Sequence, residues 1–278
     1  MSNTKQTKSD TFTVPSTTNY VTQGNGAPVI MVHGLAASLH DWDFLLPELA
    51  QAGYAGYALD LLGHGDSPKP DSRSYQMDWL SAHFEKWLDS LNLTQPAILI
   101  GHSLGGYLVL EYVRRFSART RGLILVDPFY ALSQLPHALR LMYRHPILSG
   151  LVAGRTPEWL FRIIVDFTSM SMGHSSGALH ALPEEIRAQT ALDYTRTAAG
   201  VYNLPNTGLD FTPYLPSISV PTLVVWGEQD QTLEASSFSN LVAAMPNARG
   251  KHAPSGHVPH QSNSAWFNKQ ALDFLKTL

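Results

Sequence analysis

A serine between two glycines is the residue in this sequence that most clearly could do chemistry. Ser103 lies at the centre of a Gly-x-Ser-x-Gly pattern that runs from Gly101 to Gly105. The apolar residues 98–100 before the pattern predict a buried strand, and the apolar face of residues 107–115 after it predicts a helix. A serine at a sharp strand-to-helix turn exposes its hydroxyl, and the helix N-terminus stabilises nearby negative charge. Because the pattern alone also arises by chance, its place between strand and helix is what predicts a nucleophile.

A serine hydroxyl becomes a strong nucleophile only beside a base, and that base needs a third group to fix its tautomer. Parallel strands of an open sheet bring the groups at their carboxyl ends into one crevice. Asp230 comes just after an apolar strand pattern, and His257 lies in a loop after the last such pattern. We therefore predict that Ser103, His257 and Asp230 act together as nucleophile, base and acid.

Other residues compete for two of these roles. Asp127 is the main alternative for the acid because it also ends a predicted strand, but Pro128 follows it directly and favours a turn or capping role. Among the 12 histidines, His33 and His64 lie in glycine-flanked loops, where a structural role is expected. His102 precedes the nucleophile and is predicted to point away from it.

The elements that must carry these residues alternate between strand and helix. Apolar runs predict strands at residues 28–32, 54–59, 98–100 and 122–128, from residue 221 onward, and near 248–252. Helical spacing is predicted at residues 41–52, 77–91, 107–115, 233–245 and 263–278. This alternation predicts an α/β fold with a mostly parallel central sheet and helices on both faces.

Residues 129–212 interrupt the alternation. No strand pattern occurs there, and five prolines divide short helical pieces. We predict that this segment is a helical cap inserted over the open end of the sheet. The core then comprises residues 19–128 and 213–278, and residues 1–18 are predicted to form a flexible tail.

The composition describes a globular chain with a full core, since 44% of the residues are hydrophobic and 15% are charged. A net charge of −3 argues against nucleic acid or an anionic membrane as the main partner. The chain has no cysteine, which excludes disulfides and thiolate catalysis. No apolar run approaches the length of a membrane span, and the polar N-terminus predicts a cytoplasmic location. Neither metal-ligand spacing nor a phosphate-binding loop occurs, so we predict no metal and no cofactor.

Several separate motifs resemble those of the α/β-hydrolase superfamily, and the resemblance extends from about Asn19 to the C-terminus. These motifs are His33-Gly34-Leu35, Asp60-x-x-Gly63-His64-Gly65-x-Ser67, the serine turn, Trp226-Gly227-x-x-Asp230 and Ser255-Gly256-His257. The resemblance implies the α/β-hydrolase fold and the nucleophile, acid and base named above. It also implies an oxyanion hole made by the backbone N–H groups of Leu35 and Leu104. Haloalkane dehalogenases and epoxide hydrolases of this fold have aspartate at the Ser103 position, so neither activity is expected.

The cap is the segment that would select the substrate. Its apolar side chains either line an acyl or alcohol pocket or pack the cap onto the core; the candidates for the pocket are Met142, Tyr143, Trp159, Phe167 and Met170. Acidic and basic residues are balanced in this segment, which favours a small or medium, rather apolar neutral ester as the small-molecule substrate.

We predict a serine hydrolase that cleaves carboxylic esters through an acyl-enzyme intermediate. The same residues would also serve thioesters, lactones, C–C bonds, N-terminal proline peptides or cofactor-free perhydrolysis. A ligand-binding or signalling protein on the same scaffold, without enzymatic activity, is the alternative from a different class. The sequence leaves the oligomeric state open.

Overall fold

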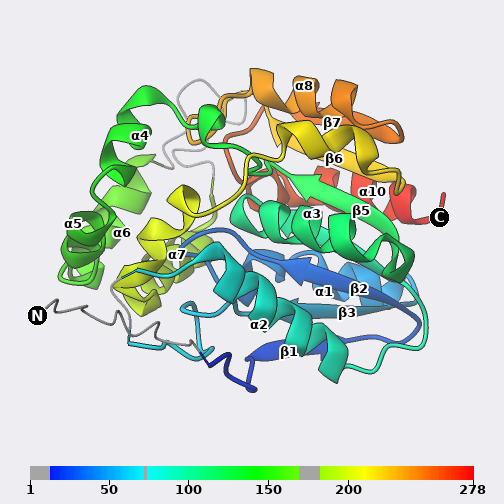
Figure 1. Cartoon of the computed structure of the whole chain (residues 1–278), viewed down its shortest axis with the longest axis horizontal. Helices are drawn as coiled ribbons and strands as arrows, with labels where there is room; N and C mark the ends of the chain where they lie inside the picture. Colours follow the sequence, from blue (N-terminus) through cyan, green and yellow to red (C-terminus); the bar gives the residue numbers. More distant parts are fainter. Residues whose placement is uncertain (1–12, 72–73, 169–181) are drawn as a thin grey trace, which may run out of the picture.

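A seven-stranded sheet runs through the centre of the chain in the computed structural model, which describes residues 13–71, 74–168 and 182–278 (Figure 1). The strand order is β1-β3-β2-β4-β5-β6-β7, and all neighbours pair in parallel except β1 with β3. The strands are β1 (Tyr20–Gln23), β2 (Ala27–Val32), β3 (Tyr54–Leu59), β4 (Ala97–His102), β5 (Thr120–Val126), β6 (Thr222–Gly227) and β7 (Ala248–Ala253). The predicted α/β fold with a mostly parallel sheet is confirmed.

Strand β2 shows why the central strands have continuous apolar sequences. Its last four residues, 29–32, are all fully buried. Successive side chains of a strand point to opposite faces, so Ile30 and Val32 join one hydrophobic cluster while Val29 and Met31 join the other. A strand that is buried on both faces needs apolar residues at every position.

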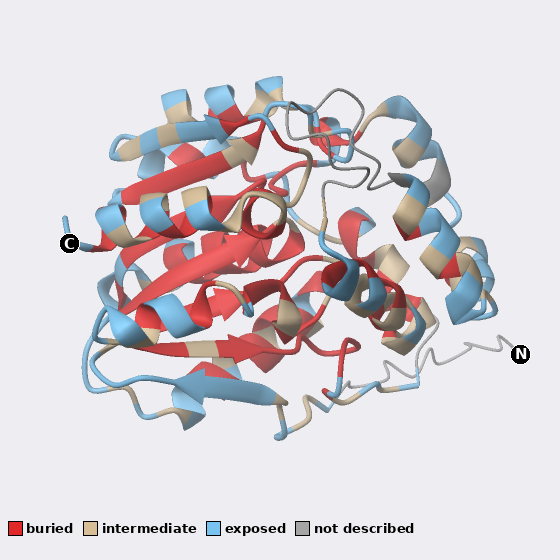
Figure 2. Ribbon diagram, turned by 180° about the vertical axis from the view of Figure 1, so that it is seen from behind, coloured by how far each residue is buried: buried red, intermediate tan, exposed pale blue. Residues whose placement is uncertain are grey.

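Helices cover both faces of this sheet (Figures 1 and 2). One hydrophobic cluster contains residues of α2 (Met77–Ser90), α3 (Leu104–Phe116) and α8 (Ser236–Ala244). The other contains residues of α1 (Leu46–Gln51) and α10 (Ser264–Leu275). In Figure 2 the buried residues follow the sheet and the helix faces turned toward it.

The helix predicted over residues 41–52 is divided in the structure. A 3-10 helix, η1 (Leu39–Trp42), comes first, and α1 begins only at Leu46. Pro47 lacks a backbone N–H and is therefore tolerated only in the first turn of a helix, which fixes where α1 begins. The helix predicted over residues 263–278 is present as α10, and a separate short helix, α9 (Pro259–Ser262), precedes it.

The described part of residues 129–212 contains helices and no strand. It comprises η3 (Leu132–Gln134), α4 (His137–Tyr143), α5 (Pro146–Ala153), α6 (Glu158–Thr168), α7 (Glu184–Arg196) and η4 (Ala199–Asn206); η2 (Ser117–Arg119) precedes it and η5 (Thr212–Ser217) follows it. The two ends of the segment are hydrogen-bonded to each other, because the Phe211 N–H donates to the Tyr130 carbonyl at 2.9 Å.

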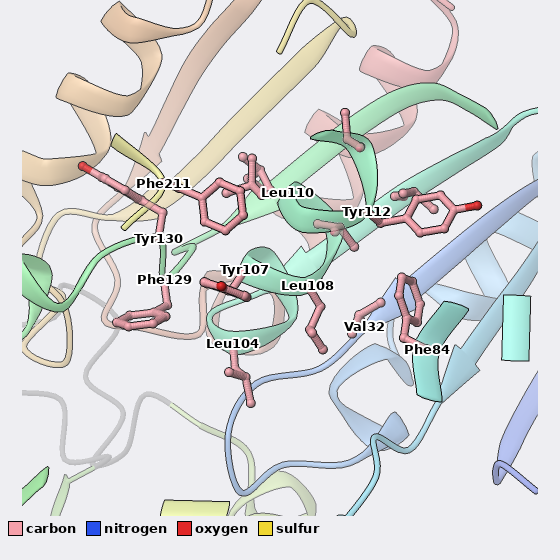
Figure 3. Packing of buried hydrophobic residues seen from close by; sticks show 14 of the residues in the cluster. Val32, Phe84, Leu104, Tyr107, Leu108, Leu110, Tyr112, Phe129, Tyr130 and Phe211 are labelled. Atoms are coloured by element: carbon pink, nitrogen blue, oxygen red, sulfur yellow. The ribbon is translucent and has the colours of Figure 1, made fainter. Parts of the chain in front are cut away.

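An aromatic contact fastens the end of this segment to α3 (Figure 3). The rings of Tyr107 and Phe211 meet edge to face, with centroids 4.9 Å apart. The Tyr107 hydroxyl also accepts the backbone N–H of Leu209 at 2.8 Å. The helix that follows the serine turn is therefore also a support for the segment above it.

The start of the described chain lies along α2. The Thr17 carbonyl is 3.0 Å from His83 Nε2, and the Val14 carbonyl accepts from Lys86 Nζ at 3.0 Å. These contacts reach into the segment predicted as a flexible tail, of which residues 1–12 lie outside the described residues. Within the described ranges, no helix has both the length and the apolar character needed to cross a membrane.

Candidate active site

Ser103 occupies a backbone conformation that side-chain-bearing residues rarely adopt. It joins β4 to α3 with φ 50° and ψ −113°. Backbone hydrogen bonds to the end of β5 and to the residues after it hold the turn in place. The Ser103 N–H donates to the Val126 carbonyl, and the Phe129 N–H donates to the Ser103 carbonyl, both at 3.0 Å. A strained conformation persists only where its surroundings fix it.

A glycine lets the helix after this turn approach the sheet. A Cβ on Gly105 would lie 2.2 Å from the Val32 carbonyl oxygen, so any side chain there would push α3 away from β2. The glycine pattern around Ser103 therefore has a steric cause in this structure.

The structure brings His257 and Asp230 together. His257 lies after β7, and its Nδ1–H donates to Asp230 Oδ2 at 2.7 Å. Asp230 Oδ1 in turn accepts the backbone N–H groups of Thr232 and Leu233, at 2.7 and 3.1 Å. Burial favours the neutral acid, but the nearby His257 and these N–H groups hold the pKa of Asp230 below its ordinary value. The carboxylate is therefore ionised and fixes the tautomer of His257.

The loop that carries His257 is attached next to Ser103. His102, the residue before Ser103, donates from Nε2 to the His257 carbonyl at 3.0 Å. The Ser103 hydroxyl and the His257 ring make no direct hydrogen bond in this structure, although both residues are described. Hydrogen bonds of this kind commonly tighten only when substrate binds.

Asp127 also lies against Asp230. It directly follows β5 and has φ 40°, and its Oδ1 accepts the Gly227 N–H at 2.9 Å, which links the ends of β5 and β6. Its other oxygen is buried and has no hydrogen-bond partner among the described residues. Burial and the charge of Asp230 raise the pKa of Asp127 well above its ordinary value. Burial therefore favours the protonated form of Asp127, one oxygen of which accepts a backbone N–H.

Two backbone segments adjoin Ser103. Leu104 is the first residue of α3, so its N–H has no acceptor within the helix. On the other side, a Cβ on Gly34 would lie 3.3 Å from the Ser103 Cβ, which places the loop of Gly34 and Leu35 against the nucleophile. The next residue, Ala36, has φ 57° and turns this loop. These are the positions from which the N–H groups of Leu35 and Leu104 were predicted to stabilise an oxyanion.

Adding a methyl group at Gly34 tests how closely this loop must approach. In Gly34→Ala the new Cβ would lie 2.9 Å from His102 Nδ1, so the loop must shift outward. We expect kcat for ester hydrolysis to fall by about a hundredfold, because an oxyanion donor contributes only at hydrogen-bond distance. Gly256→Ala is the control, since its Cβ would meet nothing within 4 Å. Equal rates for the two variants, measured on folded protein, would contradict the assignment of this loop.

The structure places the predicted pocket residues of the cap in different surroundings. Trp159 and Phe167 are 64% and 76% exposed. Tyr143 is half-buried and packs against the core. The side chain of Met142, and Met170 as a whole, lie outside the described residues. Of these five candidates, Tyr143 alone is described as packed on the core, and a pocket lined by them stays a prediction.

The sequence of the chain matches one known protein family over most of its length. The profile of the family described as alpha/beta hydrolase fold matches residues 27–263, which include Ser103, Asp230 and His257. The chain is an α/β-hydrolase.

Proteins similar to this α/β-hydrolase include some that are named as haloperoxidases and some that are named as esterases. The "Non-heme chloroperoxidase CPO-A1" of Kitasatospora aureofaciens is 29% identical, over 92% of this chain and 94% of its own. A thermophilic esterase from Thermogutta terrifontis superposes with a TM-score of 0.76 at 20% identity, covering 94% of this chain and 93% of its own. A bromoperoxidase from Bacillus anthracis gives 0.77 at 22% identity, covering 92% and 94%. The two structural matches show a shared fold.

A buried acid of α7 connects the helical segment of residues 129–212 to the loop beside Ser103 in this α/β-hydrolase. Asp193 of α7 accepts the Ser38 hydroxyl at 2.8 Å and Gln189 Nε2 at 2.8 Å. Ser38 is the N-cap residue of η1 and follows Leu35 by three residues, so the contact joins α7 to the predicted oxyanion loop. Burial raises the pKa of Asp193 to about 7, although both hydrogen bonds oppose that shift.

This raised pKa predicts a stability that falls with pH. The folded protein holds the proton of Asp193 more tightly than the unfolded chain does. Asp193 therefore costs no stability below about pH 4, a growing amount up to about pH 7, and a constant amount above that. We expect Asp193→Asn to gain free energy of unfolding relative to the parent, and the gain to be about 2 kcal/mol larger at about pH 8 than at about pH 5. Urea unfolding at both pH values checks this, and a pH-independent difference would contradict it.

Two groups of described side chains place three potential metal ligands close together in this α/β-hydrolase. In each group the ligand atoms lie within 4.8 Å of one another; the groups are Asp41, His102 and His260, and Asp127, Asp230 and His257. These residues are far apart in the sequence, so a search for ligand spacing along the chain does not detect them. The prediction that the protein uses no metal stays a prediction.

Proposed function

We propose that this α/β-hydrolase is a serine esterase that cleaves small or medium, rather apolar carboxylic esters through an acyl-enzyme. The observation that carries the proposal is the 2.7 Å contact between His257 Nδ1 and Asp230 Oδ2. It orients a base on a loop that is hydrogen-bonded to the residue before Ser103. The fixed backbone of Ser103 and the adjoining segments of Leu35 and Leu104 provide the remaining parts of an acyl-transfer site.

Each residue has one role in the proposed reaction. The Ser103 hydroxyl attacks the ester carbonyl while His257 Nε2 takes its proton, and Asp230 stabilises the imidazolium that forms. The N–H groups of Leu35 and Leu104 donate to the oxyanion of the tetrahedral intermediate. When the intermediate collapses, His257 returns the proton to the leaving alcohol. Water then attacks the acyl-enzyme in the same way and releases the acid.

The charges of the cap favour a neutral substrate. Arg162 of α6 contacts Glu184 at 2.6 Å, and Arg187 of α7 contacts Asp166 at 2.5 Å. Both arginines are paired with carboxylates of the cap. A substrate that binds beneath these helices therefore has to rely mainly on apolar contact, which is consistent with an apolar acyl or alcohol group.

A fluorophosphonate probe and a series of p-nitrophenyl esters test the proposal. The probe is expected to label Ser103, and the ester series is expected to show turnover with an optimum acyl length that measures the pocket. Labelling without turnover of any ester would instead favour the ligand-binding alternative. Turnover of thioesters, lactones, diketone C–C bonds or N-terminal proline peptides, at rates above those of esters, would shift the substrate class while keeping the mechanism.

The names of the relatives favour perhydrolysis as a second candidate. A chain that is 29% identical over 92% of this one is named a non-heme chloroperoxidase. In perhydrolysis, hydrogen peroxide replaces water as the nucleophile that attacks the acyl-enzyme, and the product is a peracid and free Ser103. Formation of peracetic acid from an acetate ester and hydrogen peroxide, compared with acetate formation in the same reaction, measures how the acyl-enzyme divides between the two.

A further inference from the structure

A buried group of three residues lies behind the proposed triad and has no part in the proton transfers. Asp41 belongs to η1, His102 ends β4, and His260 belongs to α9. All three are buried, with exposures of 7%, 4% and 2%. Charged and titratable groups are rarely buried unless they have partners, so this group calls for an explanation.

His102 lies between two hydrogen-bond acceptors. Its Nδ1 is 3.1 Å from Asp41 Oδ2, and its Nε2 is 3.0 Å from the backbone carbonyl oxygen of His257. A carbonyl oxygen accepts only, and so does an ionised carboxylate. With Asp41 ionised, both contacts are hydrogen bonds only when both ring nitrogens carry hydrogen, as in an imidazolium paired with Asp41.

The Asp41 carboxylate is ionised. Burial opposes its charge, but the hydrogen bond from His102 and the nearby His260 hold the pKa of Asp41 well below its ordinary value. His260 itself is neutral near pH 7, because burial lowers its pKa to about 4. Its Nε2 lies 3.9 Å from Asp41 Oδ2 and contributes a weak contact.

Asp41 also contacts two of the loops that the chemistry needs. The Gly34 N–H of the predicted oxyanion loop points to Asp41 Oδ2 at 3.4 Å. Gln261, which follows the His257 loop, donates to Asp41 Oδ1 at 3.1 Å. Together with His102 beside Ser103, one carboxylate is connected to the oxyanion loop, the serine turn and the base loop.

We propose that Asp41 and His102 form a buried ion pair that positions His257 and the Gly34 loop relative to Ser103. They are positioning residues, because they act through the backbone of His257 and Gly34 and touch no reacting atom. The inference rests on the proposed serine hydrolase function. A displacement of about 1 Å between reacting groups is enough to lower a rate by about a hundredfold.

Three variants separate positioning from general stability. In His102→Ala the bond to the His257 carbonyl is lost, and we expect kcat to fall about tenfold to a hundredfold with KM nearly unchanged. In Asp41→Asn the amide can still donate to His102 Nδ1, so the neutral ring keeps its bond to His257 and most of the loss is avoided. His83→Ala is the control, because His83 is equally buried and also bonds a backbone carbonyl, that of Thr17, but lies on α2.

The rates are measured at a temperature where every variant is folded. The proposal is overturned if His102→Ala keeps the parent kcat, or if His83→Ala loses as much of it. Asp41→Asn falling as far as His102→Ala would also overturn it, since the retained hydrogen bond would then have no positioning effect.

Nitrogen-15 spectra of the histidine rings give a readout that does not depend on activity. The groups that face His102 are the Asp41 carboxylate, the His257 and His260 rings, with centroids 5.0 and 4.5 Å away, and the nearby His33. We expect both ring nitrogens of His102, assigned by their loss in His102→Ala, to carry hydrogen near pH 7 in the parent and only one in Asp41→Asn. One bare nitrogen in the parent overturns the ion pair. If the parent is not labelled by the fluorophosphonate probe, the proposed function fails while these spectra still decide the pairing.

Discussion

Replacing Ser103 by alanine is expected to abolish ester hydrolysis, with a fall in kcat of at least about a thousandfold, while the protein still folds. The alanine lacks the oxygen that would attack the substrate, and the backbone hydrogen bonds of the turn to Val126 and Phe129 remain. Residual turnover would come from the oxyanion donors and from binding alone. Steady-state kinetics with a p-nitrophenyl ester, together with a thermal unfolding curve, check both parts.

Ser81→Ala is the matched control for this experiment. Ser81 is a buried serine of α2, so its replacement removes a hydroxyl from the same kind of surroundings without touching the site. We expect it to keep the parent rate and the probe labelling. A Ser103→Ala variant that retained most of the parent activity would contradict the acyl-enzyme mechanism.

The second large effect is expected from Asp230→Asn. An asparagine cannot carry the charge that stabilises the His257 imidazolium, and its amide N–H competes with the ring N–H that now faces the carboxylate at 2.7 Å. Loss of the acid in a serine triad lowers kcat by about 10⁴-fold, because the base is held in the wrong tautomer. The ratio of kcat between parent and variant, at a pH near 8, measures it.

Asp127→Asn distinguishes the two candidate acids. Burial favours the neutral form of Asp127, to which the amide is close in shape and charge, and the amide oxygen can still accept the Gly227 N–H. We expect kcat to change by less than about threefold. If Asp127→Asn were the more damaging of the two replacements, the acid would have been assigned to the wrong strand end.

The sheet could be predicted because its central strands are buried on both faces. Residues 29–32 have no polar side chain, so their apolar run identifies a strand without knowledge of its neighbours. Helix boundaries were harder to predict from the sequence, because they depend on local backbone chemistry. Pro47 and the Ser38 cap divide the predicted helix of residues 41–52 in two, and apolar spacing alone does not record either effect.

The site could be predicted only where its residues are close in sequence or follow strand ends. The serine turn lies within a few residues, and Asp230 and His257 each follow a predicted strand. The ion pair of Asp41 and His102 joins segments 61 positions apart, and the sheet order rather than either segment creates it. His102 was predicted only to point away from the nucleophile. The sequence position of Asp41 could have drawn attention to it, because it directly precedes the large apolar Trp42 and is buried with it.

The contact of Asp193 with Ser38 was also missed, for a related reason. It connects residues 155 positions apart, Ser38 at the start of η1 and Asp193 in α7. The acid lies among apolar neighbours of α7, close to the buried Ala191, which is the kind of position where a charged residue signals a specific partner. The fold alone shows that Asp193 is buried and which residue it contacts.

The hydrogen bond between Phe211 and Tyr130 has a consequence for how this protein could be re-engineered. Because the chain positions before and after the predicted insertion are hydrogen-bonded to each other, we expect that a segment of another length can be spliced between them without moving the sheet. The entropic free-energy cost of closing such a loop grows only with the logarithm of its length, by about 0.6 kcal/mol for each doubling. Chimaeras that exchange this segment among homologues should therefore alter selectivity while inheriting the same reaction machinery.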